Sequence, residues 1–159
     1  MSTALPSRPR QVGQRRTFAI VASQYNREFV AGLVDHARRE LEAISPGFSV
    51  VMHEVPGAYE IPLVVQEVAA RGGIDAIIAL GVIIEGATQH ASLIATAITN
   101  SLLQISLAQR IPVIHEVLLV KDETQARVRC LEETINRGTE AARVAAQMVQ
   151  TIGTLRSSR

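Results

Sequence analysis

The sequence predicts an α/β fold, a three-layer α/β/α sandwich with a mostly parallel four-stranded sheet. Four short apolar runs alternate with segments of helix length, and this alternation places a parallel sheet between two layers of helices. The chain has 159 residues, 47% of them hydrophobic, so it can bury one sizeable core. No internal repeat is visible. We therefore expect a single domain over residues 17–159, preceded by a flexible arm over residues 1–16.

The first half of the domain is expected to contain two strands and two helices. Residues 17–22 form a short apolar run, and the next segment repeats apolar residues four positions apart up to Leu41, as an amphipathic helix does. Glu40 lies off that apolar stripe. Residues 48–55 are the second strand. A proline and a glycine then lead into a helix that ends near Arg71.

The second half begins with a strand–turn–helix unit between Asp75 and Ile94. An apolar run passes through Gly81 and Gly86 and reaches the start of a long helical pattern at His90. Such units hold ligands in α/β sheets, because glycine lets the backbone approach closely and the first N–H groups of a helix favour an anion. We expect an anion site here with one titratable side chain, His90.

One strand and two helices complete the chain. Residues 113–120 are the fourth strand, and a short helix is expected over residues 123–130. Thr139 is the expected N-cap of the last helix. The apolar face of that helix is expected to consist of Val144, Ala145, Met148 and Ile152.

The helix that follows His90 is unusual because residues 91–109 carry no charge. A membrane span has about that length, but the helix holds too many hydroxyl and amide side chains for one. A surface helix of a monomer normally carries charges on its outer face. We therefore expect a homo-oligomer, in which the sheet covers one side of this helix and a second subunit covers the other, and no membrane partner.

Charge and cysteine content restrict the partners and the compartment. The net charge of +1 gives no electrostatic case for nucleic acid; the arginines of the arm are expected to be solvated, with a nucleic-acid role as the alternative. The single cysteine, Cys130, has no disulfide partner, which favours a reducing cytoplasm. The N-terminus lacks the apolar segment of a secretory signal.

Polar segments after the strands are expected to meet at one edge of the sheet, because the carboxyl ends of parallel strands lie together. Tyr25 and Asn26 follow the first strand, residues 56–60 follow the second and residues 82–90 follow the third, while His115 lies within the fourth. A ring, an acid, an anion-binding turn and an imidazole are thus expected in one cleft.

Several common chemistries find no support in the sequence. There is no dinucleotide-binding glycine motif, P-loop or nucleophilic serine elbow. We expect neither a metal nor a cofactor, because Cys130 is alone and metal-ligand spacing is absent among the histidines His36, His53, His90 and His115. Arg129 offers a guanidinium whose fork suits phosphate. The remaining possibility is a reaction that two substrates largely perform themselves once they are held in register.

Four motifs resemble those of the lumazine synthase family, in the family's order and spacing. They are V-P-G-A-Y-E-I-P at residues 55–62, G-x-x-I-x-G-A-T-x-H at 81–90, Q-A-x-x-R at 125–129 and N-R-G-x-E-A-A at 136–142. The resemblance spans about residues 17–150. It implies a flavodoxin-like sheet, assembly from pentamers and active sites shared between neighbouring subunits, and it adds an association with riboflavin synthase as a further expectation.

The resemblance also implies a reaction and its residues. The family condenses 5-amino-6-(D-ribitylamino)uracil with 3,4-dihydroxy-2-butanone 4-phosphate to 6,7-dimethyl-8-ribityllumazine, phosphate and water, in the penultimate step of riboflavin biosynthesis. His90 is implied to be the proton-transfer residue. The implied substrate contacts are Ala87, Thr88 and Arg129 for the phosphate, Tyr25 for the pyrimidine ring, Ala58, Tyr59 and Glu60 for the ribityl chain, Val82, Ile83 and Ile84 for the ring pocket, and His115 from the adjacent subunit, with Asn26, Arg137 and Glu140 near the site.

The chain departs from the family pattern at a few positions. Glu85 stands where the family usually has arginine, Ala91 and Ser92 replace an aromatic–acidic pair, and His115 replaces a common phenylalanine. These departures keep one alternative open, a lumazine- or flavin-binding paralogue or scaffold without turnover. An FMN electron carrier is a weaker alternative, because the loop after the first strand has few hydroxyl groups. In the arm, two prolines disfavour an added strand and favour a free pentamer or a small multiple of it.

Overall fold

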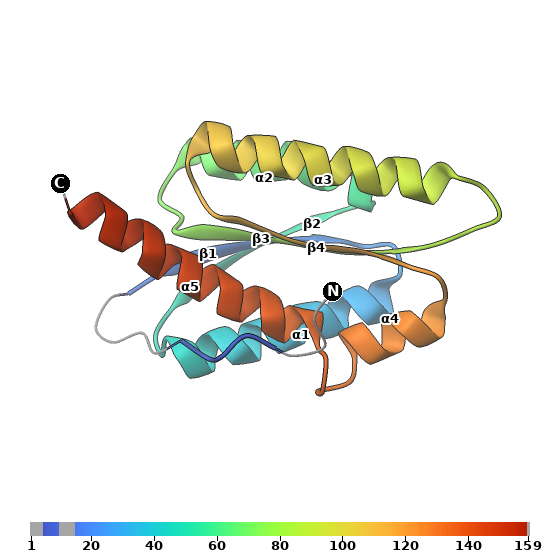
Figure 1. Cartoon of the computed structure of the whole chain (residues 1–159), viewed down its shortest axis with the longest axis horizontal. Coiled ribbons are helices and arrows are strands. Elements are labelled where there is room, and N and C mark those ends of the chain that lie inside the picture. The colour runs from blue at the N-terminus through green and yellow to red at the C-terminus, as the bar shows by residue number, and fades with distance from the viewer. Residues whose placement is uncertain (1–4, 10–14, 159) are drawn as a thin grey trace.

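The computed structural model of the chain describes residues 5–9 and 15–158. It shows a four-stranded sheet between two layers of helices (Figure 1). The elements are, in chain order, β1 (Thr17–Ser23), α1 (Arg27–Ile44), β2 (Ser49–Val55), the 3₁₀ turn η1 (Ala58–Glu60), α2 (Ile61–Arg71), β3 (Ala76–Ile84), α3 (His90–Gln109), β4 (Val113–Val120), α4 (Glu123–Cys130) and α5 (Arg137–Ser157).

The four strands are parallel throughout and lie in the order β2-β1-β3-β4. This order confirms the predicted fold class. The chain moves outward from β1 in opposite directions to reach β2 and β4, so the strand order reverses between β1 and β3. In open α/β sheets ligands bind at the carboxyl ends of the strands beside such a reversal.

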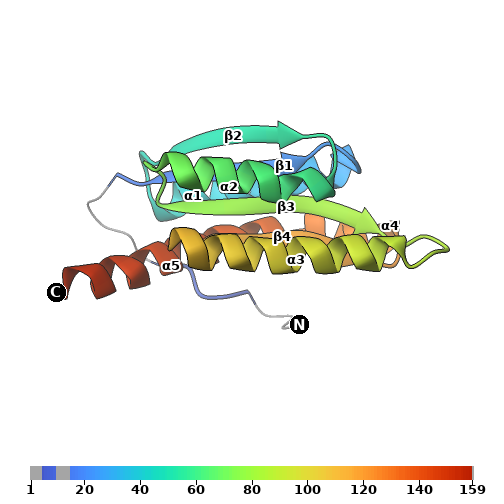
Figure 2. The ribbon, with the colours of Figure 1, turned by 90° about the horizontal axis from the view of Figure 1, so that it is seen from above.

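Helices α1, α4 and α5 cover one face of the sheet, and α2 and α3 cover the other (Figures 1 and 2). Side chains alternate between the two faces along each strand. Phe18 and Ile20 of β1 point into the core under α1 and α5, whereas Ala19 and Val21 point into the core under α2 and α3. Both faces of β1 are therefore buried, as expected of an inner strand of a parallel sheet.

Two predictions about α5 are wrong. The helix begins at Arg137, two residues before the predicted cap Thr139, and its N-cap is Asn136, whose side-chain oxygen accepts hydrogen bonds from the backbone N–H groups of Gly138 and Thr139. The buried stripe matches the predicted one fully only at Ala145; Val144 and Ile152 are half-buried. It consists mainly of alanines that allow α5 to lie close to α1, while Met148 is 36% exposed.

Glu40 is buried although it lies off the apolar stripe of α1. Arg8 donates hydrogen bonds to both of its carboxylate oxygens, at 2.7 and 2.9 Å, and Arg143 of α5 donates one at 2.7 Å. Arg143 also donates to the carbonyl oxygen of Pro6 at 2.8 Å. The part of the predicted arm over residues 5–9 is thus bound to α1 and α5. The other residues predicted to form the arm, apart from 15 and 16, lie outside the described residues.

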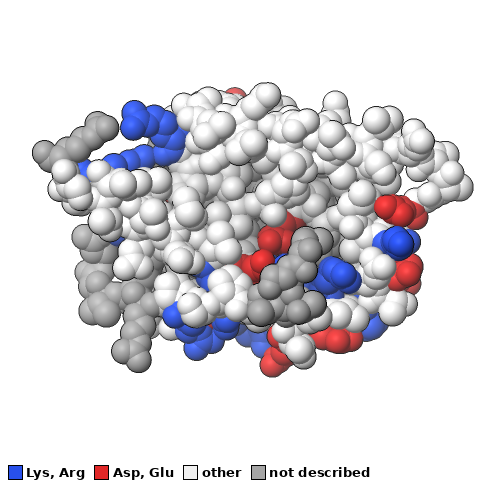
Figure 3. All heavy atoms as spheres, in the orientation of Figure 1, with Lys and Arg blue, Asp and Glu red and all other residues white. Residues whose placement is uncertain are grey.

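Helix α3 has one face buried against the sheet and one apolar face that is exposed, which agrees with its lack of charge. Ile98, Leu102 and Ile105 are buried against the sheet, while Leu103 and Leu107 project outward. By length and composition alone, α3 is long and apolar enough to cross a membrane, and it is the one such helix in the described chain. On the face seen in Figure 3, charged side chains gather over the layer of α1, α4 and α5, whereas the surface over α3 carries few of them apart from a basic group at one end.

Candidate functional site

The segment after β1 crosses the point where the strand order reverses. Asn26 adopts a left-handed backbone conformation with φ of 55°, which asparagine tolerates better than most residues. Its side-chain Nδ2 donates to the carbonyl oxygen of Val82 at 2.8 Å. The backbone N–H of Tyr25 donates to Pro56 at 3.2 Å. Asn26 and Tyr25 thereby connect the carboxyl ends of β1, β2 and β3.

The turn after β2 lies directly beside Tyr25. The Glu60 carboxylate accepts a hydrogen bond of 2.9 Å from the backbone N–H of Gly57 and so closes η1. A Cβ atom at Gly57 would lie 3.1 Å from two carbons of the Tyr25 ring. Glycine at this position therefore lets the ring rest against the backbone. Tyr25, Tyr59 and Glu60 are exposed, so the single chain presents this group at an open edge.

The turn between β3 and α3 forms the next part of the edge. The backbone N–H of Glu85 donates to Val120 at 2.8 Å and fixes the start of the turn to the end of β4. The turn itself is exposed from Glu85 to His90. Thr88 Oγ1 lies 3.4 Å from the backbone nitrogen of His90, the first residue of α3. The N–H groups at this helix start favour an anion, with the imidazole of His90 beside it.

The remaining predicted residues at this edge differ in burial. Val82 is buried, and Ile83 and Ile84 are half-buried. Arg129 is half-buried on α4, where its Nη1 donates to the carbonyl oxygen of Gln125 at 3.2 Å. The other nitrogens of the guanidinium supply further N–H groups. Arg129 thus stands at the same end of the sheet as the β3–α3 turn, on the other helical layer.

His115 is not brought to this edge within its own chain. It pairs with Ala79 in the middle of the sheet and lies five positions along β4, about 16 Å, before Val120. Its Nδ1 accepts from the backbone N–H of Val117 at 3.1 Å, so the neutral ring carries its proton on Nε2, which lies 2.7 Å from Thr99 Oγ1. Burial lowers the pKa of His115 and favours this neutral form.

Arg137 and Glu140 form an ion pair at the start of α5, in which Arg137 is buried and Glu140 is half-buried. The sequence reading missed a third member of this cluster, Glu116 of β4. Burial and the charge of Glu140 raise the pKa of Glu116 to about 8, and Arg137 acts in the opposite direction. The available signal was one carboxylate inside the apolar run of residues 113–120. The neighbouring thiol of Cys130 is buried, which raises its pKa to about 12 and leaves it unreactive.

The arrangement can hold an aromatic ring, a polyhydroxyl chain and a phosphate side by side. Tyr25 supplies a ring face, η1 supplies backbone and carboxylate groups, and the start of α3 supplies N–H groups for an anion. His90 is the one imidazole at this edge within the described chain. Among residues 5–9 and 15–158, no three or more His, Cys, Asp or Glu side chains are placed to hold a metal ion together.

Comparison with known proteins gives a consistent result. A model of the 6,7-dimethyl-8-ribityllumazine synthase family matches residues 15–152. The chain is 37% identical over 141 residues to the 6,7-dimethyl-8-ribityllumazine synthase of Burkholderia multivorans, covering 88% of this chain and 80% of the relative. It is 39% identical over 136 residues to that of Chlorobium phaeobacteroides, covering 83% and 86% of the two chains. The protein of the same name from Burkholderia vietnamiensis is 37% identical over 141 residues, covering 88% and 81%.

Proposed function

The chain belongs to the 6,7-dimethyl-8-ribityllumazine synthase family, and from this premise we propose how its carboxyl edge carries out the reaction. The enzyme is a transferase of riboflavin biosynthesis. It condenses 5-amino-6-(D-ribitylamino)uracil with 3,4-dihydroxy-2-butanone 4-phosphate to 6,7-dimethyl-8-ribityllumazine, phosphate and water. The observation that supports this function most is the family match over residues 15–152, which includes every segment at the carboxyl edge.

The two substrates are proposed to bind on either side of the strand-order reversal. The pyrimidine ring stacks on Tyr25 against the apolar edge of β3, and the ribityl hydroxyls meet η1, including Glu60. The phosphate binds at Ala87 and Thr88, where the helix start favours an anion. Arg129 supplies a second, charged phosphate contact.

His90 is assigned the proton transfers. The amine of the pyrimidine attacks the ketone of the butanone phosphate, and an imine forms as water leaves. A later elimination breaks the carbon–oxygen bond to the phosphate and leaves an enol, which rearranges to a ketone. The ribityl-bearing amine then attacks the carbon of that ketone, and loss of a second water closes the ring of the lumazine. An imidazole beside the leaving phosphate can accept and return protons near neutral pH. Much of the rate comes from holding both substrates in register, so the imidazole assists the reaction without being indispensable.

Membership of the family makes this an oligomeric enzyme. We propose a homopentamer, or a small multiple of it, with sites at the subunit interfaces. The exposed Tyr25, Tyr59 and His90 support this proposal, because one chain leaves them open to solvent. His115 of an adjacent subunit would then close the site that His115 of the same chain cannot reach.

The proposal also includes a compartment, the cytoplasm, and a protein partner, riboflavin synthase. A lone, buried, unreactive cysteine suits a cytoplasmic protein. The product lumazine is consumed in the final step of riboflavin synthesis, so an association with riboflavin synthase would shorten its transfer.

Formation of the lumazine chromophore from the two purified substrates tests the function. The expected result is a rate above the spontaneous background measured without protein. No product above that background would overturn the assignment. Tight binding of lumazine or a flavin without turnover would instead identify a binding paralogue, the alternative that Glu85 beside the anion site keeps open.

A further inference from the structure

The imidazole ring of His115 lies at the free edge of the sheet. Strand β4 is the outermost strand next to β3, and the carbonyl oxygen of Val120 faces β3, where it accepts from the backbone N–H of Glu85. Backbone directions alternate along a strand, so the N–H of Val117, three positions earlier, points away from β3. The Nδ1 of His115 accepts a hydrogen bond from this N–H at 3.1 Å. The imidazole thus satisfies a backbone group that an edge strand otherwise leaves unpaired.

The other ring nitrogen of His115 is held by α3. The Oγ1 of Thr99 donates to the carbonyl oxygen of Ala95 at 2.8 Å, so this hydroxyl offers its lone pairs to the ring. The Nε2–H of His115 donates to it at 2.7 Å. Both nitrogens of the imidazole are therefore engaged within the chain, and both hydrogen bonds require the same tautomer, with the proton on Nε2.

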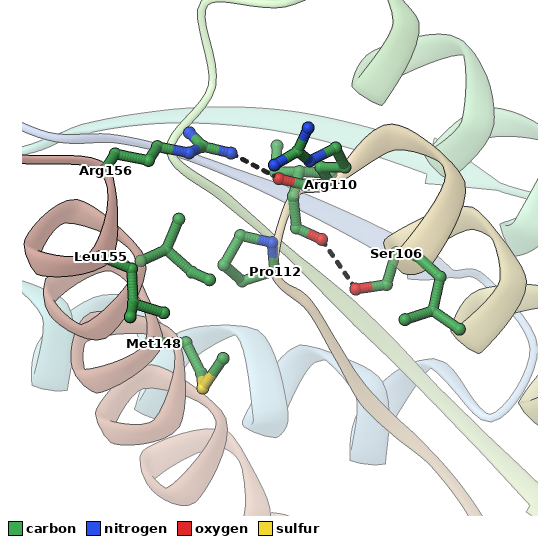
Figure 4. Close-up of a pocket in the computed structure, with 9 residues that line it drawn as sticks. Ser106, Arg110, Pro112, Met148, Leu155 and Arg156 are labelled. Carbon is green, nitrogen blue, oxygen red and sulfur yellow. Dashed lines mark hydrogen bonds between the residues drawn. The ribbon is translucent and has the colours of Figure 1, made fainter. Parts of the chain in front are cut away.

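A second hydroxyl on the same face of α3 makes a different contact. Ser106 follows Thr99 by seven positions, which is two turns of helix. It donates to the carbonyl oxygen of Ile111 at 2.7 Å, beside the groove that Pro112 and Met148 line in Figure 4. Ser106 thus fixes α3 to the backbone before β4, whereas Thr99 holds a side chain. Removing either hydroxyl therefore tests a different role of the helix.

Protonation of His115 would disrupt this arrangement. An imidazolium carries an N–H on both nitrogens, so its Nδ1–H would face the N–H of Val117, and two donors would oppose each other. Along the two elements that hold the ring, no charge favours the imidazolium. Residues 91–109 of α3 carry none, Glu116 points to the other face of the sheet, and His90 lies nine positions before Thr99, about 14 Å along the helix. Burial acts in the same direction and lowers the pKa of His115.

We propose that Thr99 is a positioning residue, which keeps the imidazole of His115 neutral and fixed, so that it serves the adjacent subunit's site as a rigid ring and not as an acid or base. The inference rests on the proposed function, because that function places His115 at the site of the adjacent subunit. A ring that is already fixed can pack against the planar pyrimidine at little cost in entropy. The proton transfers then remain with His90.

Thr99→Val tests the positioning, because valine keeps the shape of threonine and removes the hydroxyl. The less restrained ring should raise the KM for the pyrimidine about fivefold, with little change in kcat. Thr99→Ser keeps the hydroxyl and should restore most of the native KM. Thr96→Val is the matched control: Thr96 Oγ1 likewise donates to a carbonyl oxygen four positions earlier, that of Ser92, at 2.9 Å, and it has no imidazole partner in the described chain.

A double substitution separates the ring from the helix. His115→Phe removes both ring nitrogens, so adding Thr99→Val to it should change the KM no further. An equal rise in KM in both backgrounds would overturn the proposal, because Thr99 would then act through α3 itself. Ser106→Ala removes the other hydroxyl contact of α3 and should leave the KM for the pyrimidine unchanged. A rise in KM as large as that of Thr99→Val would assign the effect to the placement of the helix.

Nuclear magnetic resonance of the protein labelled with ¹⁵N in histidine observes the ring without turnover. The signal that disappears in His115→Phe should report a proton on Nε2 and should not titrate between about pH 5 and 8, where an ordinary imidazole changes its charge. A proton on Nδ1, or a titration in that range, would contradict the proposal. A protein that shows this fixed tautomer but forms no lumazine would contradict the proposed function and leave the restraint on His115 intact.

Discussion

The two helical layers of this protein differ in how their polar and apolar groups are satisfied. In the layer of α1, α4 and α5, the buried carboxylate of Glu40 receives hydrogen bonds from two arginines, and the buried side chain of Asn136 caps α5. In the layer of α2 and α3, the outer face instead exposes leucines such as Leu63 and Leu107. The first layer, which we call the completed layer, satisfies its buried polar groups within its own chain, although Leu155 near the end of α5 is exposed; the second layer leaves apolar side chains uncovered on its outer face.

This difference predicts that substitutions in the two layers have different effects. Changes inside the completed layer should lower the free energy of unfolding. Changes on the outer face of the other layer, or at the exposed turn that starts α3, should alter turnover or assembly and leave the fold unaffected. A substitution inside the completed layer that alters turnover, or one on the outer face of the other layer that destabilises the fold, would contradict this expectation.

The largest effect is expected from Gly138→Ala in the completed layer. A Cβ atom at Gly138 would overlap the carbonyl group of Leu33, so α1 and α5 would have to move apart. Because the overlap is with backbone, we expect a loss of about 3 kcal/mol or more in the free energy of unfolding. Urea denaturation measures it. Gly153→Ala on the same helix is the control, since its Cβ would lie 4.0 Å from the nearest atom, Arg16 Nη2, and should be neutral or stabilising.

His90→Ala should lower kcat about 100-fold and leave the free energy of unfolding within about 0.5 kcal/mol of the native value. The imidazole is exposed at the first residue of α3, so the fold does not depend on it. Residual activity above background is expected because the substrates remain aligned. The neighbouring exposed residue supplies the control, Gln89→Ala. A native rate in His90→Ala would remove the imidazole from the proton transfers.

The sequence predicted the sheet and its helices because these depend on apolar runs and their periodicity. It could not separate apolar residues that fill the core from apolar residues that stay exposed, so it predicted Met148 on the buried face of α5. It also could not choose between two cap-forming residues three positions apart, Asn136 and Thr139. Only the fold shows that the amide of Asn136 reaches two backbone N–H groups.

The candidate site was predictable to the extent that motifs and strand ends determine it. Tyr25, Asn26 and η1 follow strands that are neighbours, so their meeting follows from topology. The surroundings of His115 could not be predicted in this way. Its distance from the carboxyl edge depends on the register between β3 and β4, and its ring contacts Thr99 of α3. Buried charges were the other omission. The burial of Glu40 requires an arginine from 32 positions away in the arm, which no local pattern reveals.

Glu40→Gln should lower the free energy of unfolding by about 1–2 kcal/mol at about pH 7, because the two arginines lose their shared anion. The hydrogen bond from Arg8 is the main reason that the pKa of Glu40 lies below its ordinary value of 4.5, despite burial. A carboxyl with a lowered pKa stabilises the fold above its ordinary pKa and loses that contribution as the pH falls through the folded-state value. The difference between native and variant protein should therefore shrink at acidic pH. Glu42→Gln, on the same helix and exposed, should show no such dependence.

Arg129→Ala tests whether the completed layer also serves the site. We expect the KM for the butanone phosphate to rise about tenfold with little change in kcat, because a charged contact to the phosphate is lost in both ground and transition states. Steady-state kinetics with the pyrimidine at saturation measures it. Arg127→Ala is the control, since Arg127 is exposed on the same helix and pairs with Glu28 at 3.4 Å. An unchanged KM would mean that Arg129 does not contact the phosphate and that α4 has only a structural role.

The smallest effect is expected at Glu116, the carboxylate that the completed layer accommodates least well. Its pKa of about 8 lies above the ordinary value of 4.5, chiefly through burial, so between these pH values the folded protein keeps a proton that the unfolded chain releases. Stability from this group is then full below about pH 4.5 and falls as the pH rises towards 8. Glu116→Gln removes that loss but also removes the charge that Arg137 faces, so we expect only a small part of it to be recovered, about 1 kcal/mol at about pH 8, with the advantage disappearing in acid. Urea denaturation across the pH range measures the difference. A destabilised variant at about pH 8 would mean that the charge of Glu116 is needed beside Arg137, and that the completed layer is satisfied at this position as well.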